Sequence, residues 1–285
     1  MLYGYRIPQN ITWTVGGASV PAFETDIRLS NSQPSEQTVI SGVAVSSPII
    51  GEYIDIRADW AVPQGLGAVG ILNLSCPAGT RIVVTGRRVG DGGYARDLGG
   101  NSDSRTQLVE GRVQLIVVCT DPELDYIGVQ IRIYNDAGGV TWADDTTDLY
   151  VGEIVPCATT TLCARPARSR GRSSRSTRDR ASNGALHIYP HGEYRTESLS
   201  IIGTVAEAYK GALPGGVDFQ QLQKMQDQPK YRALIIPRGV NDYSLGPDYD
   251  LVQRKAIFAA VSWGKIAEEE AVMRVAVPLE AEEAV

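Results

Sequence analysis

The chain has 285 residues, 43% of them hydrophobic, which is enough for one large or two ordinary domains with a real core. Its 30 glycines and 15 prolines, beside only 3 phenylalanines and 3 methionines, favour strands and turns over helices. The net charge of −6 gives no general attraction to nucleic acid or to an anionic membrane. No run of about 18 apolar residues is present, so we expect no membrane-spanning helix.

The N-terminus and the cysteines predict the compartment. Residues 1–10 lack a basic stretch followed by an apolar run, so we expect no secretory signal and a chain that folds in a reducing cytoplasm. The cysteines, Cys76, Cys119, Cys157 and Cys163, are too few for a disulfide framework in a chain of this length. We expect Cys76 and Cys119 to be small buried hydrophobes, with a Cys157–Cys163 bridge as a minor alternative.

The first half alternates short strand patterns with turn residues. β-branched and apolar residues recur with a period of two or in short buried runs, at 11–15, 53–57, 68–72, 81–85, 113–119, 126–134 and 149–155. Glycine-rich turns separate them, and no helical period of useful length interrupts them. The pattern predicts a β-sandwich or jelly roll over residues 1–156.

The composition then changes. Residues 164–183 are arginine, serine, alanine and glycine without large apolar side chains. Such a segment cannot bury enough surface to offset the entropy of ordering it, so we predict a mobile or extended linker over 157–183.

The remainder, 184–285, predicts a second β-rich domain with one helix. Strand patterns lie at 185–189, 197–202, 232–237, 255–264 and 269–279. The helix is expected over 217–228, where Asp218 is the N-cap, Phe219, Leu222 and Met225 share one side, and Pro229 ends it.

The order of these elements resembles that of tailed-bacteriophage minor tail or distal tail (baseplate) proteins with a galactose-binding-like jelly roll. The similarity lies in the strand–turn–strand segment Val69–Val84, in the pair 130–136 and 149–154, and in the helix followed by Leu234–Pro237. The C-terminal half is similar to a tail-tube-like β domain. The usual distal tail arrangement places the tube-like domain first, so the order here departs from it.

The resemblance implies a structural protein of the virion tail tip, made in the host cytoplasm. It implies a ring of copies between the tail tube and the host-interacting parts, in contact with tail tube, hub or tail-tip proteins. Separately from the resemblance, the residue patterns lead us to expect no cofactor and no enzymatic activity.

Residue patterns for catalysis are poor. His187 and His191 are four residues apart, but Pro190 excludes the helix that would make them a metal pair. No nucleophile elbow, zinc-protease or phosphate-loop pattern occurs. A hydrolase would need carboxylates that only the fold could bring together.

One acidic and aromatic region is a candidate glycan or Ca²⁺ contact. Carboxylate and amide oxygens suit Ca²⁺, and an aromatic ring can stack on a sugar. The alternative is a solvated acidic loop, because the regular spacing of a calcium loop is missing. The candidate residues are Tyr94, Asn135, Asp136, Trp142, Asp144 and Asp145.

The arginine cluster is the sharpest local feature. It contains no aromatic residue, so specific recognition of single-stranded nucleic acid is unsupported. It could bind phosphates non-specifically or lie along an acidic groove of a neighbouring copy. We favour the second, with a solvated linker that has no partner as the alternative. Its members are Arg165, Arg168, Arg170, Arg172, Arg175, Arg178 and Arg180.

The leading hypothesis is therefore a phage tail-tip structural protein. The alternative is a carbohydrate-binding protein that adheres to a host receptor, with its site at the loops near Tyr94 and Trp142.

Overall fold

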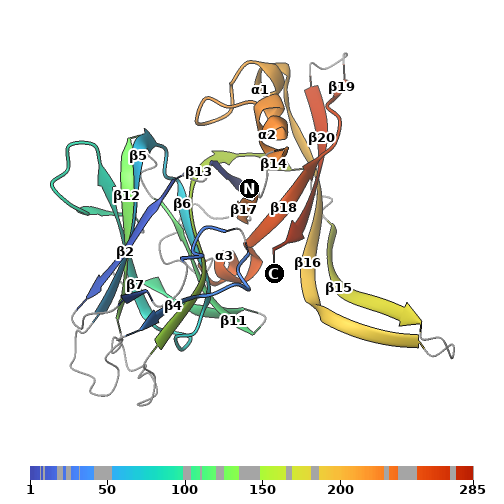
Figure 1. The fold of residues 1–285 in the computed structure, drawn as a ribbon. Helices are drawn as coiled ribbons and strands as arrows, with labels where there is room; N and C mark the ends of the chain where they lie inside the picture. The colour runs from blue at the N-terminus through green and yellow to red at the C-terminus, as the bar shows by residue number, and fades with distance from the viewer. Residues whose placement is uncertain are drawn as a thin grey trace. The chain divides into compact units, whose positions relative to one another are not determined.

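The computed structural model of the chain divides into two compact units (Figure 1). Unit 1 comprises Met1–Thr160 and Leu234–Ala256, and unit 2 comprises Thr161–Ala233 and Ile257–Val285. The structure describes residues 1–6, 8, 10–17, 22–23, 27–31, 33–41, 53–98, 104–109, 111–119, 125–134, 148–164, 169–180, 186–227, 231–236, 249–269 and 274–284.

The first sheet of unit 1 is antiparallel and is built around the long strand β13 (Asp148–Thr161). Its order runs β10 (Gln107–Val109), β11 (Arg112–Val118), β6 (Ala68–Leu74), β13, β1 (Leu2–Arg6) and β17 (Ala233–Ile236). β4 (Thr38–Ser41) pairs with β13, and β3 (Ala22–Phe23) pairs with β4.

The second sheet of unit 1 has the order β2 (Thr12–Gly17), β5 (Tyr53–Gln64), β12 (Tyr126–Tyr134), β7 (Arg81–Arg88) and β8 (Arg96–Asp97). β9 (Ser104–Arg105) also pairs with β7. Apolar residues at alternate positions of its strands point inward, as the period-two pattern requires. Ile56, Val129 and Ile131 from this sheet share one buried cluster with Ile71 and Leu115 from the first sheet.

Unit 1 is thus a β-sandwich of curled antiparallel sheets, and the chain as a whole is mainly β, as predicted. Among its described residues, one helix belongs to it, α3 (Tyr249–Lys255), which the sequence patterns did not predict. The side chain of Gln253 is fully buried and pairs with the main chain of β11, accepting from Ile116 N and donating to Ile116 O, each at 2.7 Å. This one amide reproduces the pairing that a neighbouring strand would make.

Unit 2 contains a sheet with β18 (Ile257–Trp263), β20 (Arg274–Glu283) and β16 (Leu186–Thr204) in order. β14 (Cys163–Ala164) and β15 (Ser169–Arg180) pair with β16, and β19 (Ala267–Glu269) pairs with β20. The short helix α1 (Val205–Tyr209) begins with a capping box between Thr204 and Glu207.

The helix predicted over 217–228 is α2 (Phe219–Gln226). Asp218 caps it by accepting from Gln221 N at 2.8 Å, and Phe219 and Leu222 are buried, as predicted. Phe219 packs against Trp263 of β18, with ring centroids 6.2 Å apart.

The prediction of an extended linker over 157–183 differs from the structure. Residues up to Thr161 continue β13, and Ser169–Arg180 form β15 against β16. Main-chain hydrogen bonds to a neighbouring strand require no apolar side chain, so a chain of arginine, serine and threonine can still pair at a sheet edge.

Candidate functional site

The outward face of the second sheet of unit 1 carries an interlocked set of charged and aromatic side chains. β5, β12 and β7 contribute alternate residues to it, since every second side chain of a strand points away from the core. We call this surface the guanidinium face. It consists of Tyr53, Asp55, Arg57, Asp59, Arg81, Arg87, Tyr94, Gln130, Arg132 and Tyr134.

Asp55 is the centre of one half of this face. Its side chain is only 3% exposed, and it accepts from Arg132 Nε at 2.7 Å, from Arg132 Nη2 at 2.9 Å and from Gln130 Nε2 at 2.7 Å. This two-pronged contact raises the pKa of the Arg132 guanidinium above its ordinary value. The same guanidinium lies 3.9 Å from the ring centroid of Tyr53. The Asp55 carboxylate and the Arg132 guanidinium are therefore held in a fixed orientation relative to each other.

Tyr94 is the centre of the other half. Its hydroxyl donates to Asp59 Oδ1 at 2.6 Å, and Arg87 Nη2 contacts the same oxygen at 2.6 Å. Burial, together with the Asp59 carboxylate, raises the pKa of the Tyr94 hydroxyl, so it remains a donor. The guanidinium groups of Arg87 and Arg57 lie 5.3 and 5.8 Å from its ring centroid.

Gly128 of β12 makes room for this half of the face. A Cβ at Gly128 would lie 2.5 Å from Asp59 Oδ1 and 3.0 Å from the carbonyl oxygen of Ala58. Only glycine fits beneath the Asp59–Tyr94 pair without displacing it.

Of the six residues predicted as a glycan or Ca²⁺ contact, Tyr94 is the one in the described part of the chain. Asn135, Asp136, Trp142, Asp144 and Asp145 lie outside it. Sequence reasoning did not find the partners of Tyr94, because they come from β5 and β7. The alternation of arginine, aspartate and tyrosine along 53–59 and 130–134 was the signal that could have indicated them.

The described part of the predicted arginine segment lies in β15, which pairs with β16 to form a two-stranded ribbon. One of its arginines, Arg170, lies where β16 also pairs with β20, and the others lie further along the ribbon. Arg170 pairs with the buried Glu197 at 3.0 Å, and Arg172 lies opposite Arg195, whose main chain and side chain donate to Glu283. Arg175, Arg178 and Arg180 lie further along β15, whereas Arg165 and Arg168 are outside the described residues.

This ribbon continues past the end of β20 (Figure 1). β20 pairs with β16 only over Thr196–Thr204, whereas β15 pairs with β16 as far as Arg180 and Leu186. We call the segment beyond β20, Ser173–Arg180 with Leu186–Tyr194, the arm. Among the described residues of unit 2, no third strand pairs with the arm.

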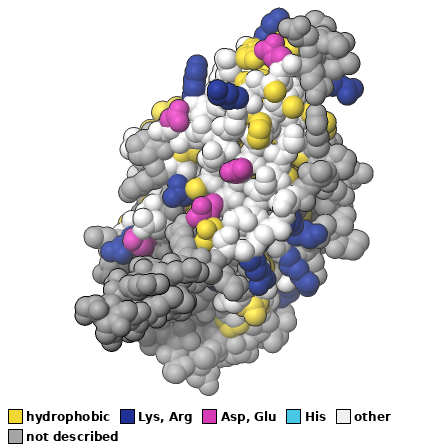
Figure 2. All heavy atoms as spheres, turned by 90° about the vertical axis from the view of Figure 1, so that its right-hand side faces the viewer, with side chains coloured by type: hydrophobic (Ala, Val, Ile, Leu, Met, Phe, Trp, Pro, Cys, Tyr) yellow, Lys and Arg dark blue, Asp and Glu magenta, His cyan; other side chains and the backbone are white. Residues whose placement is uncertain are grey.

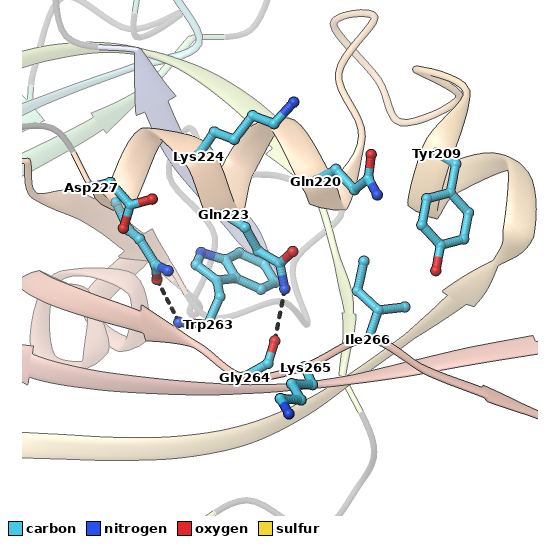
Figure 3. A pocket seen from close by; sticks show the side chains of 10 residues that line it. Tyr209, Gln220, Gln223, Lys224, Asp227, Trp263, Gly264, Lys265 and Ile266 are labelled. Carbon is cyan, nitrogen blue, oxygen red and sulfur yellow. Dashed lines mark hydrogen bonds between the residues drawn. The ribbon is translucent and has the colours of Figure 1, made fainter.

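A hollow of about 690 Å³ lies beside α2 in unit 2 (Figure 3). Gln223 Nε2 donates to the carbonyl oxygen of Gly264 at 2.7 Å, and Gln226 Oε1 accepts from Trp263 N at 2.7 Å. At the rim, the Tyr209 hydroxyl donates to Glu268 at 2.6 Å. The Trp263 side chain is nearly buried, so its ring belongs to the core of unit 2 and leaves the hollow lined mainly by polar side chains.

A second hollow of about 350 Å³ crosses the sheet of unit 2. Small and polar residues and Val261 line it, together with three glutamates: Glu280 and Glu282 of β20, and Glu197 of β16, which pairs with Arg170. Figure 2 looks from the side on which β15 and β16 lie in Figure 1; on the described part of this face, basic, acidic and hydrophobic side chains are scattered among white atoms of the backbone and of other side chains.

Metal and thiol chemistry have little support in the described residues. No group of three or more His, Cys, Asp or Glu side chains among them is arranged to hold a metal ion. Cys76, Cys119 and Cys157 are buried free thiols and Cys163 is an exposed one, so the Cys157–Cys163 bridge is not formed. Within the same residues, none of the helices has the length and apolar character needed to span a bilayer.

Comparison with known proteins adds only distant likenesses. No protein-family model matches the chain, and no curated protein matches it. Among solved structures, the chain is similar to CBM32-1 from a family 31 glycoside hydrolase from Clostridium perfringens, with 12% identity and a TM-score of 0.30, over 54% of this chain and 98% of that one. A second similar structure is CpGH89CBM32-4 from the same organism, in complex with GlcNAc-α-1,4-galactose. It has 12% identity and a TM-score of 0.30, over 51% of this chain and 89% of that one.

Proposed function

We propose that this protein is a structural subunit that assembles with copies of itself, as the resemblance to tail-tip proteins of tailed bacteriophages implies. The observation that carries the proposal is the arm. An isolated two-stranded ribbon is marginally stable in water. The arm therefore gains most from a surface that it can cover, and a neighbouring copy is the partner that every subunit has.

Charge supports a second copy as that partner. The described part of the arm contains Arg175, Arg178 and Arg180, while the chain as a whole carries a net charge of −6. Glu280 and Glu282 line the shallow hollow on the sheet of unit 2. Arginine against carboxylate gives orientation and faster association. A contact between an arm and a different surface is head-to-tail, so it closes into a ring when the rotation allows.

The proposal is tested by the state of association in solution. We expect the full-length protein to form concentration-dependent oligomers in sedimentation velocity and rings in negative-stain micrographs. Replacement of residues 173–194 by a short Gly-Ser turn should leave the circular dichroism spectrum β-rich and the protein monomeric. An oligomer that persists without the arm, or a wild-type monomer at every concentration, contradicts the proposal.

A milder pair of variants keeps the arm and changes only its charge. Arg178→Ser with Arg180→Ser should weaken association at least tenfold, because two guanidinium contacts are lost. Arg28→Ser with Arg96→Ser is the matched control, since both are half-exposed arginines of unit 1. Equal effects of the two pairs would mean that overall charge, and not the arm, governs association.

The place in a virion needs its own experiment. Antibody labelling of phage particles should put the protein at the tip of the tail, and label on the head or along the tail tube would contradict that assignment. The alternative function, carbohydrate binding, is supported by one of its candidate contact residues, Tyr94, because the other candidates lie outside the described residues.

A further inference from the structure

We propose that the guanidinium face binds an acidic polysaccharide, with Arg57 and Arg87 as the residues that contact its carboxylate or sulfate groups. This inference is independent of self-assembly, because the face belongs to unit 1 and the arm belongs to unit 2.

The first step is the surplus of positive charge on the face. Four arginines, Arg57, Arg81, Arg87 and Arg132, share it with two aspartates, Asp55 and Asp59. Both carboxylates are turned toward arginines and are thereby neutralised. An incoming anion therefore meets guanidinium groups in a chain that is acidic overall.

The second step is that two arginines keep donors for a ligand. Arg57 contacts Asp55 only through Nη2 at 3.4 Å, and its side chain is 44% exposed. Arg87 contacts Asp59 through Nη2 alone, and its side chain is 33% exposed. Arg132, in contrast, uses both Nε and Nη2 on Asp55 and serves to position the others.

The third step is that these donors are held in place before a ligand arrives. Asp59 and Tyr94 fix Arg87, and Asp55 and the Tyr94 ring restrain Arg57. A planar guanidinium held in this way loses little further entropy when it meets a carboxylate or sulfate.

The choice of a polysaccharide follows from what the face lacks. Each of its three tyrosine rings, Tyr53, Tyr94 and Tyr134, already has a guanidinium group within 6 Å of its centroid. No ring is left open as a stacking platform for nucleic-acid bases. Among the outward residues of β7 on this face, Val83 is the apolar one, and it lies opposite Arg132, so the described face lacks the broad apolar centre that protein interfaces usually contain. A flexible chain with regularly spaced anionic groups fits these conditions.

The test is isothermal titration of the full-length protein with polygalacturonate, with heparin, with neutral dextran of similar length and with a single-stranded oligonucleotide. We expect polygalacturonate and heparin to bind, with an affinity that falls as salt rises, and dextran not to bind. We expect the oligonucleotide to bind at least tenfold more weakly than either acidic polysaccharide.

The decisive variant is Arg57→Gln with Arg87→Gln, which should lower the affinity for polygalacturonate at least tenfold. Arg28→Gln, at a similar exposure elsewhere in unit 1, should change it less than twofold. Thermal unfolding of each variant checks that the fold is retained, and Arg57→Gln alone, which breaks a single long contact, should still weaken binding if the double variant is destabilised.

Several results would overturn the inference. One is the absence of binding to either acidic polysaccharide. Another is unchanged binding by the double variant, which would assign the affinity to the arm or to other arginines. An equal loss of affinity in Arg28→Gln would show that binding depends only on the net charge of the protein. Oligonucleotide binding as tight as polysaccharide binding, lost in the same double variant, would assign the face to nucleic acid instead.

Discussion

At the scale of one residue, the guanidinium face depends on Gly128, which leaves space for the Asp59–Tyr94 pair. Main-chain and carboxylate oxygens leave no space for a side chain there. We expect Gly128→Ala to lower the free energy of unfolding by about 1–3 kcal/mol, the usual cost of overpacking. Urea denaturation measures the change. Gly92→Ala is the matched control, because a Cβ at Gly92 meets no atom within 4 Å.

The cysteines give a second prediction at this scale. Burial raises the pKa of the Cys76 thiol to about 11 and that of Cys157 to about 12, and it raises the pKa of Cys119 as well. Thiolates react and thiols do not, so these three should be inert at pH 8. Iodoacetamide should add one group to the native protein, at Cys163, as judged by intact mass and peptide mapping. Modification of a second cysteine before denaturant is added would contradict the burial.

At the scale of elements, Gln253 is the residue that attaches α3 to β11. Gln253→Ala leaves the N–H and C=O of Ile116 without partners in a buried setting, at a cost of about 1–3 kcal/mol for each group. We expect the midpoint of urea unfolding to fall accordingly. Gln220→Ala, on the exposed side of α2, should change stability by less than about 0.5 kcal/mol. Similar values for the two variants would show that α3 contributes little.

Patterns along the chain predict those elements whose own side chains determine them. The strands of the sandwich alternate apolar and polar residues, and α2 has both its cap and its apolar side in the sequence, so these were predicted correctly. β15 and α3 were missed for a common reason. The pairing of β15 with β16 is made by main-chain atoms, and α3 contacts β11 through the side chains of Gln253 and Gln114, whose partners lie 137 and 139 residues away.

The guanidinium face illustrates the same limit for a site. Tyr94 could be chosen from the sequence as an aromatic residue in a turn-rich segment. Its hydrogen-bond partner Asp59 is 35 residues away, and the arginines beside it come from other strands. Cross-strand register, which no single-strand pattern contains, decides which charges meet.

At the scale of the whole molecule, the chain passes between the two units three times, after residues 160, 233 and 256. The predicted division into 1–156 and 184–285 assigned all of the chain after 183 to the second domain. In the structure, Leu234–Ala256 returns to unit 1, where β17 pairs with β1 through Leu2↔Ile236 and Gly4↔Leu234. Cutting the chain once therefore cannot separate the two units intact.

This organisation predicts the behaviour of a fragment. Residues 1–156 alone lose β17, whose Leu234, Ile235 and Ile236 are fully buried, and they lose Gln253 beneath Ile116. The unpaired edge of β1 and the uncovered core should make the fragment aggregate or bind a hydrophobic dye.

A second fragment supplies the contrast, with residues 1–160 joined to 231–256 by a flexible Gly-Ser linker of about 15 residues. Because it restores both the β1–β17 pairing and the Gln253 contact, it should be soluble and unfold in a single cooperative transition, measured by circular dichroism and calorimetry. If residues 1–156 unfold as cooperatively and at the same temperature as the joined fragment, then Leu234–Ala256 adds nothing to the stability of the sandwich, and the simpler two-domain division is correct.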